Sequence, residues 1–195
     1  IYNFTADVDS SSTLNLFLIN ITGYLVKKNY FINLNQANSS CNISSLNLLD
    51  SDNHIDDFIN INHISKHTTS STIQKNILKG KSKCIFYAKA KIFDKSYSSQ
   101  VSQTNNNIIL SNNAIVHSNP QLEIHNNDVK CSHGSTTGEL DADALFYMRS
   151  RGIDLSECKK LILNGFANSI IENIMNNKIK NKIKNKIDNW LLNVN

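Results

Sequence analysis

Apolar and polar residues alternate along roughly the first 130 residues, rather than recurring at every third or fourth position. The clearest case is KCIFYAKAKIF, residues 83–93. One side of this segment, if extended, carries Cys84, Phe86, Ala88, Ala90 and Ile92. Residues 14–21 and 107–110 are similarly strand-like. A two-residue period is typical of half-buried strands, so the pattern predicts an all-β region.

The breaks between these apolar runs favour one kind of β architecture. They are rich in Ser, Asn and Asp, contain few Gly and the single Pro120, and lack the Asn-Gly or Asp-Gly pairs that mark tight hairpins. No exact repeat is visible. We therefore expect a coiled, stacked sheet of the β-helix type rather than a meander of hairpins.

The apolar period lengthens after Gly138, which predicts a change from strands to helices. Asp141 is a favourable N-cap, and Leu140 and Leu145 occupy the two positions of a hydrophobic staple. Gly152 suits the left-handed position just past a helix end. A helix is therefore expected through ADALFYMRSR, ending at Gly152.

A second helix is expected to begin at once, because Asp154 and Glu157 form a D-x-x-E capping box. Its apolar stripe is formed by Leu163, Phe166, Ile170 and Ile174. Two helices joined by a glycine turn resemble a DNA-binding helix-turn-helix. The second helix begins with the acidic DLSEC, where base-reading residues would lie, which argues against that function.

The segment KIKNKIKNK, residues 178–186, carries five lysines and no acid. An i, i+4 apolar stripe runs through it, formed by Ile179, Ile183, Ile187 and Leu191. Residues 178–195 thus form a basic amphipathic tail that a partner groove or an acidic membrane surface could receive. A frayed, solvated tail is the favoured interpretation. The net charge is +4, and without this tail the body is nearly neutral, which disfavours a nucleic-acid-binding domain.

Composition sets the remaining limits. The 195 residues, 40% of them hydrophobic, are enough for one substantial domain with a real core. About one residue in six is Asn; we expect this excess to reflect an AT-rich genome rather than a ladder-forming role. No apolar run could span a bilayer and no secretory signal is present, so an intracellular chain is expected. It starts without Met, which suggests a piece of a longer protein.

Cys131 and His133 are the strongest candidates for metal chemistry. They lie two residues apart, so on an extended segment both project to the same side. Thiolate and imidazole together suit iron, zinc or copper. A buried thiol beside a hydrogen-bonded histidine is the alternative. The four cysteines are widely spaced and form no zinc-finger pattern, so free thiols are expected.

His63 and His67, with Asp56 and Asp57 upstream, could imitate a hydrolase site. No nucleophile elbow and no glycine-rich phosphate loop accompanies them. Structural or surface histidines are the better interpretation.

Three motifs in order resemble the SufB/SufD family, the β-helix scaffold proteins of SUF iron–sulfur cluster assembly. They are HTTSSTIQKNILKGKSKCIFYAKAKI, VKCSHGSTTGELDADALFYMRSRGID and RGIDLSECKKLILNGFANSIIENI. The resemblance covers about residues 10–176. It implies a right-handed parallel β-helix over residues 1–137 and a small helical domain over 138–177, whereas the basic tail over 178–195 is unlike the family's usual ending.

The resemblance favours the SufD branch. SufB-type chains have Thr-Asn-Cys where this chain has Thr104, Asn105 and Asn106, so their sulfur-handling thiol is missing. They also have an acid after the histidine, where this chain has Gly134. Cys-Ser-His-Gly at residues 131–134 is the SufD pattern, in which the histidine is implicated in cluster assembly. Cys131 is either a ligand or a core residue.

The resemblance also implies partners. A SufB-type paralogue would pair through the β-helix and share a transient iron–sulfur cluster, and a SufC-type ATPase would dock on the closing helices. The docking residues implied are Leu145, Phe146, Arg149, Arg151 and Phe166. The chain has no Walker motif, so it would bind no nucleotide itself and act as a non-catalytic scaffold.

Two other functions remain open. The chain could be a SufB-type or stand-alone cluster carrier, or a purely structural subunit of the complex. It lacks the family's N-terminal helical region, so it is a fragment or a reduced gene product. The AT-rich bias fits the cytoplasm of a reduced bacterial symbiont, or alternatively a plastid.

Overall fold

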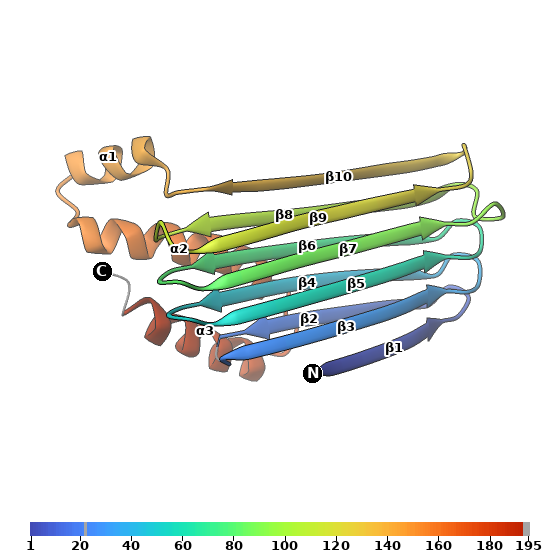
Figure 1. The fold of residues 1–195 in the computed structure, drawn as a ribbon, viewed down its shortest axis with the longest axis horizontal. Coiled ribbons are helices and arrows are strands. Elements are labelled where there is room, and N and C mark those ends of the chain that lie inside the picture. The colour runs from blue at the N-terminus through green and yellow to red at the C-terminus, as the bar shows by residue number, and fades with distance from the viewer. Residues whose placement is uncertain (22, 193–195) are drawn as a thin grey trace.

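The β-rich part of the chain coils into two facing parallel sheets (Figure 1). The computed structural model describes residues 1–21 and 23–192, and within these ranges it contains ten strands, five in each sheet, and three helices. The strands are β1 Tyr2–Val8, β2 Thr13–Asn20, β3 Leu25–Leu34, β4 Ser40–Leu49, β5 His54–His63, β6 Thr69–Leu78, β7 Lys83–Ile92, β8 Ser99–Ile109, β9 Ile115–Ile124 and β10 Val129–Gly138.

Successive strands alternate between the two sheets. Odd-numbered strands pair in the order β1-β3-β5-β7-β9, and even-numbered strands in the order β10-β8-β6-β4-β2, all in parallel. Each rung therefore contributes one strand to each sheet, and the chain climbs from rung to rung. The predicted β-helix, followed by helices, is confirmed.

The two-residue period sorts side chains between the interior and the outside. The predicted inner row of β7 is confirmed, since every member is 0% exposed: Cys84, Phe86, Ala88, Ala90 and Ile92. Burying such apolar side chains stabilises the fold by about 25 cal/mol per Å² of surface removed from water.

Corners between strands use left-handed backbone instead of tight hairpins. Positive φ angles occur at Ser11, Asn38, Ser51, His67 and Ser98. Gly80 has φ +69°, and a Cβ there would lie 2.7 Å from the backbone nitrogen of Ser51 in the corner below. Only glycine fits this close approach of two stacked corners.

The helices begin and end where the capping residues predict. Their bounds are α1 Ala142–Ser150, α2 Leu155–Ile171 and α3 Asn177–Leu191. Asp141 accepts hydrogen bonds from the backbone N–H groups of Asp143 and Ala144, and Gly152 has φ +84° after α1. Across the described residues, no helix is long and apolar enough to cross a membrane.

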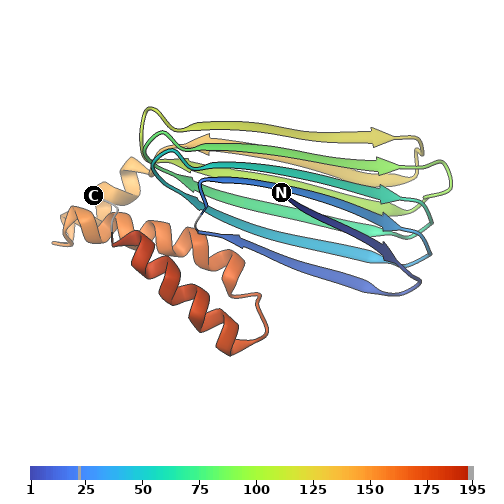
Figure 2. The ribbon, with the colours of Figure 1, turned by 60° about the horizontal axis from the view of Figure 1, so that its bottom comes forward.

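Helices α2 and α3 lie against the outer face of the even-numbered sheet at one end of its strands (Figure 2). On the sheet side the buried cluster comprises Leu46, Leu48 and Ile77. On the helix side it includes Leu163, Ala167, Ile170, Ile171, Ile174, Ile187 and Leu191. The predicted stripe is confirmed on α2 for Leu163, Phe166 and Ile170, while Ile174 joins the same cluster from just beyond the end of the helix. The strands beneath this cluster are buried on both faces there.

The favoured interpretation of a frayed, solvated tail is wrong for residues 177–191. Asn176 caps α3 by accepting from the backbone N–H groups of Lys178 and Ile179. Ile187 and Leu191 are buried against α2 and the sheet, so packing rather than intrinsic propensity holds the helix. The remainder of the predicted tail, residues 193–195, lies outside the described residues.

The expectation that asparagine has no ladder-forming role is also wrong. In the interior, Asn47 donates to Asn76 at 2.8 Å, and Asn76 donates to Asn107 at 2.6 Å. On the outer faces, Asn29 donates to Asn3 and Asn62 to Asn33 at 2.7 and 2.9 Å. Stacked amides satisfy one another from rung to rung, so many asparagines have a structural role whatever the origin of their abundance.

Candidate functional site

The candidate site lies on the last rung of the β-helix (Figure 1). Strands β9 and β10 end the two sheets, and β10 pairs with β8 on one edge. Within the described ranges, no strand covers its other edge. The inward side chains of this rung therefore face an open end, with backbone groups ready to pair with another strand.

Cys131 lies at the inner margin of this open end. It is half-buried and packs against Ala90, Ile92 and Val101. Burial raises the pKa of its thiol, and a hydrogen bond from the Val101 backbone lowers it by a smaller amount. The thiol is thus mainly protonated at neutral pH and must lose its proton before it can bind a metal.

His133 belongs to the same inward row but is exposed, since no further rung of the described residues lies over it. Its register partner on β8 is Gln103, as Val101 is the partner of Cys131. The sequence prediction that Cys131 and His133 project to one side is thereby confirmed. Of the two side chains, Cys131 is the more buried and packs against the core cluster.

The described part of the chain holds no group of three His, Cys, Asp or Glu side chains that could bind a metal ion. The other three cysteines are free and buried, and none of them lies at the open end: Cys41, Cys84 and Cys158. Cys131 and His133 together are therefore an incomplete donor set.

The second histidine cluster is structural, as expected. His63 is buried, and its two ring nitrogens lie 2.8 Å from the hydroxyls of Thr68 and Ser70. Desolvation lowers the pKa of His63 to about 4, so it is neutral at pH 7. His67 instead sits at a corner, edge-on to Tyr97. The two histidines do not form a hydrolase site.

The aspartates upstream of these histidines are engaged elsewhere. Asp57 pairs with the buried Lys28 at 3.0 Å, and Asp56 pairs with the more exposed Lys27 at 3.2 Å. Asp57 also accepts a hydrogen bond from Asn47 at 3.0 Å. These carboxylates stabilise the β-helix interior and its outer face, respectively.

Helix α1 offers an exposed surface of aromatic and basic side chains. None of its described residues is buried, and Phe146 is 77% exposed. Arg151 stacks over Tyr147 at 5.1 Å. The pKa of Asp154 is lowered mainly by a hydrogen bond from the Ser156 side chain, and the charge of Arg149 lowers it further. Large exposed aromatics flanked by arginine are typical of protein-binding surfaces.

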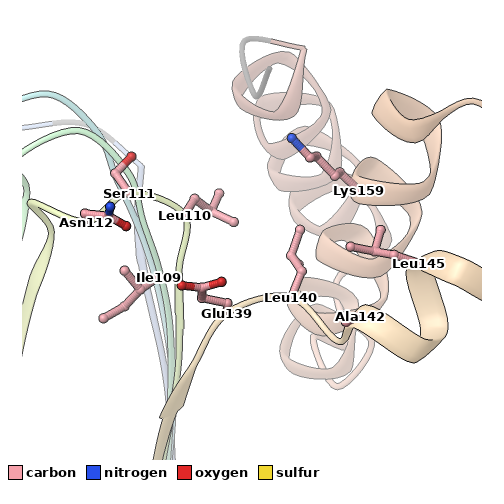
Figure 3. A pocket seen from close by; sticks show the side chains of 9 residues that line it. All are labelled: Ile109, Leu110, Ser111, Asn112, Glu139, Leu140, Ala142, Leu145 and Lys159. Atoms are coloured by element: carbon pink, nitrogen blue, oxygen red, sulfur yellow. The ribbon is translucent and has the colours of Figure 1, made fainter.

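Two of the predicted docking residues do not belong to this exposed surface, although Leu145 is part of α1. Figure 3 shows Leu145 in a cleft of about 360 Å³ between the β8–β9 corner and the helices, opposite Leu110 and near Leu140. Phe166 packs on the sheet, with the ammonium of Lys75 at 4.4 Å from its ring. The five predicted residues therefore do not form one exposed patch.

Comparison with known proteins identifies the family. The family model for the SUF system FeS cluster assembly SufBD core domain matches residues 1–166. The chain belongs to the SufB/SufD family. It is 31% identical over 164 residues to the iron–sulfur cluster assembly protein SufD of Escherichia coli. The aligned stretch covers 84% of this chain and 38% of that protein.

Two further relatives match shorter stretches of the chain. A SufBD family protein of Synechocystis is 32% identical over 58% of this chain and 25% of its own length. The chloroplastic protein ABCI7 of Arabidopsis thaliana is 39% identical over 36% of this chain and 15% of its own length. The chain thus spans well under half of these curated relatives. The family match ends before α3, which begins at Asn177.

Proposed function

We propose that the chain is part of a SufD-type scaffold subunit of a SUF iron–sulfur cluster assembly complex. The family match over residues 1–166 carries this proposal. An end rung that holds His133 and Cys131 beside an unpaired strand edge supports it. The scaffold is non-catalytic and binds no nucleotide, and the cluster is its cargo.

The open end suits pairing with a SufB-type paralogue. Cluster iron takes four ligands, mostly thiolates. Cys131 and His133 supply two at most, and no third His, Cys, Asp or Glu of the described residues joins them in a metal-binding group. A partner whose last rung meets β10 would supply the remaining ligands and screen the nascent cluster from water.

The closing helices suit docking of a SufC-type ATPase. Exposed Phe146 on α1 would be the apolar anchor, with Arg149 and Arg151 around it. Leu145 would act from the neighbouring cleft, and Phe166 through the packing of α2 on the sheet. Nucleotide-driven motion of the ATPase would then reach the open end through α2.

Asn106 and Gly134 support the SufD-type assignment over the SufB-type one. Asn106 accepts a hydrogen bond from the Thr136 hydroxyl at 2.9 Å and has no sulfur chemistry. A stand-alone carrier would need a complete donor set, which Cys131 and His133 do not form. A purely structural subunit remains the second candidate, and bacterial and chloroplastic relatives fit the bacterial cytoplasm or a plastid.

Co-purification with the SufB-type and SufC-type partners tests the proposal. In the full-length protein, His133→Ala should assemble normally, but bind markedly less iron and sulfide after reconstitution. His117→Ala is the matched control, since His117 is also exposed on an end strand but faces outward from β9. Equal cluster yield in both variants would leave a purely structural subunit. A stoichiometric cluster without partners would establish the carrier instead.

A further inference from the structure

The column of inward side chains beneath His133 becomes more polar toward the open end. From β2 to β10 the register partners are Leu16, Ile43, Thr72, Gln103 and His133. The lower rungs are apolar, as a core requires, whereas an amide and an imidazole lie at the top. Gln103 is the register partner of His133, one rung below it.

Gln103 is buried with an unsatisfied acceptor. Its side chain is 2% exposed, and its Oε1 atom has no hydrogen-bond partner within the described ranges. Leaving a buried polar group unpaired costs about 1–3 kcal/mol. An amide oxygen can only accept, and the imidazole above it carries an N–H in either protonation state.

Register partners in this interior already bond across β8 and β10. Asn107, four residues along β8, donates to the Oγ1 atom of its β10 register partner Thr137 at 3.1 Å. Asn76 makes the equivalent bond to Asn107 one rung lower, at 2.6 Å. The spacing of the rungs therefore suits a hydrogen bond of the same kind from His133 to Gln103.

We propose that Gln103 positions His133 by accepting a hydrogen bond from its imidazole. The ring nitrogen that faces β8 carries the proton, so the other nitrogen presents a lone pair to the open end. A neutral imidazole with one fixed N–H is the form that binds a metal. This inference rests on the proposed function, and it adds Gln103 as a positioning residue of the site.

Nitrogen-15 NMR of the histidine rings tests the inference at a pH where His133 is neutral, with its signals assigned through His133→Ala. The native chain should show one tautomer at His133. Gln103→Leu removes the acceptor from a column that already holds Leu16 and Ile43, and both tautomers should then appear. Gln103→Met, which keeps the chain length without the amide, is the second variant.

Thr72→Val is the matched control, since Thr72 lies in the same column one rung below Gln103 and should leave the tautomer unchanged. In the complex, both Gln103 variants should lower iron affinity by roughly tenfold or more, as loss of such outer partners does. An unchanged single tautomer in both variants would overturn the inference. His133→Ala with undiminished cluster yield would instead overturn the assembly role, while the NMR result would still decide the hydrogen bond.

Discussion

At the residue scale, the interior of this β-helix depends on polar side chains that satisfy one another. The Lys28–Asp57 ion pair is joined through Asn47 and Asn76 to Asn107, so one hydrogen-bonded chain crosses several rungs. A group inside such a network leaves its partner unsatisfied when it is removed. A single substitution in a buried pair should therefore lower the free energy of unfolding more than one in an exposed pair.

Asp57→Ala should lower the free energy of unfolding by about 3–5 kcal/mol, because it leaves Lys28 as a buried charge without its partner. Asp56→Ala removes the neighbouring exposed pair with Lys27 and should cost less than about 1 kcal/mol. Urea unfolding of the two variants measures both values. Similar losses would show that Lys28 gains water or another partner when Asp57 is removed.

His63 should make stability fall in mild acid. Its folded pKa of about 4 lies below the unfolded value of 6.5, so the unfolded chain binds the proton more tightly. The stabilisation is complete above pH 6.5 and is lost as the pH falls toward 4, by roughly 3 kcal/mol. Urea unfolding at pH 7 and 4.5 should show a smaller pH effect in His63→Leu than in His117→Ala or the native chain. An equal pH effect would assign the acid sensitivity to other groups.

At the element scale, α3 shows what an apolar stripe leaves undecided. The i, i+4 spacing locates the helix, but a short helix is stable only when its apolar face is covered. That cover is α2 together with the outer face of β4 and β6 beneath it, where Leu46, Leu48 and Ile77 break the alternation of buried and polar positions. Apolar residues on both faces of a strand were the available signal that a helix packs there.

Ile187→Ala should destabilise the protein by about 2–4 kcal/mol, because it opens a cavity between α3, α2 and the sheet. Ile179→Ala makes the same change about two turns earlier in α3, at a side chain that is 52% exposed, and should cost under about 1 kcal/mol. Unfolding curves, with hydrogen exchange of α3 amides, distinguish the two. Equal small effects would indicate that α3 contributes little to the stability of the fold.

At the scale of the whole molecule, alternation and the absence of tight turns predicted the β-helix, while its side-chain columns escaped prediction. Bonded column partners lie at separations that include 26, 27, 29, 30 and 31 residues, since the corners differ in length. No fixed repeat therefore reveals which residues stack. Cys131 and His133 could be found from their own motif, whereas Gln103 becomes visible only once the register of β8 and β10 is known.

The exposed aromatic surface of α1 gives the last prediction. Phe146→Ala in the full-length protein should weaken binding of the SufC-type ATPase by roughly tenfold or more, because an aromatic anchor in an interface contributes about 2 kcal/mol. Its unfolding should be unchanged, since Phe146 is 77% exposed. Phe166→Ala should instead leave ATPase binding unchanged and lower the free energy of unfolding, because Phe166 packs against Lys75 and the cluster beneath α2. Calorimetric titration with the ATPase and urea unfolding of both variants measure the four values. If Phe166→Ala weakens binding at unchanged stability while Phe146→Ala does not, the ATPase docks along α2 and not on α1.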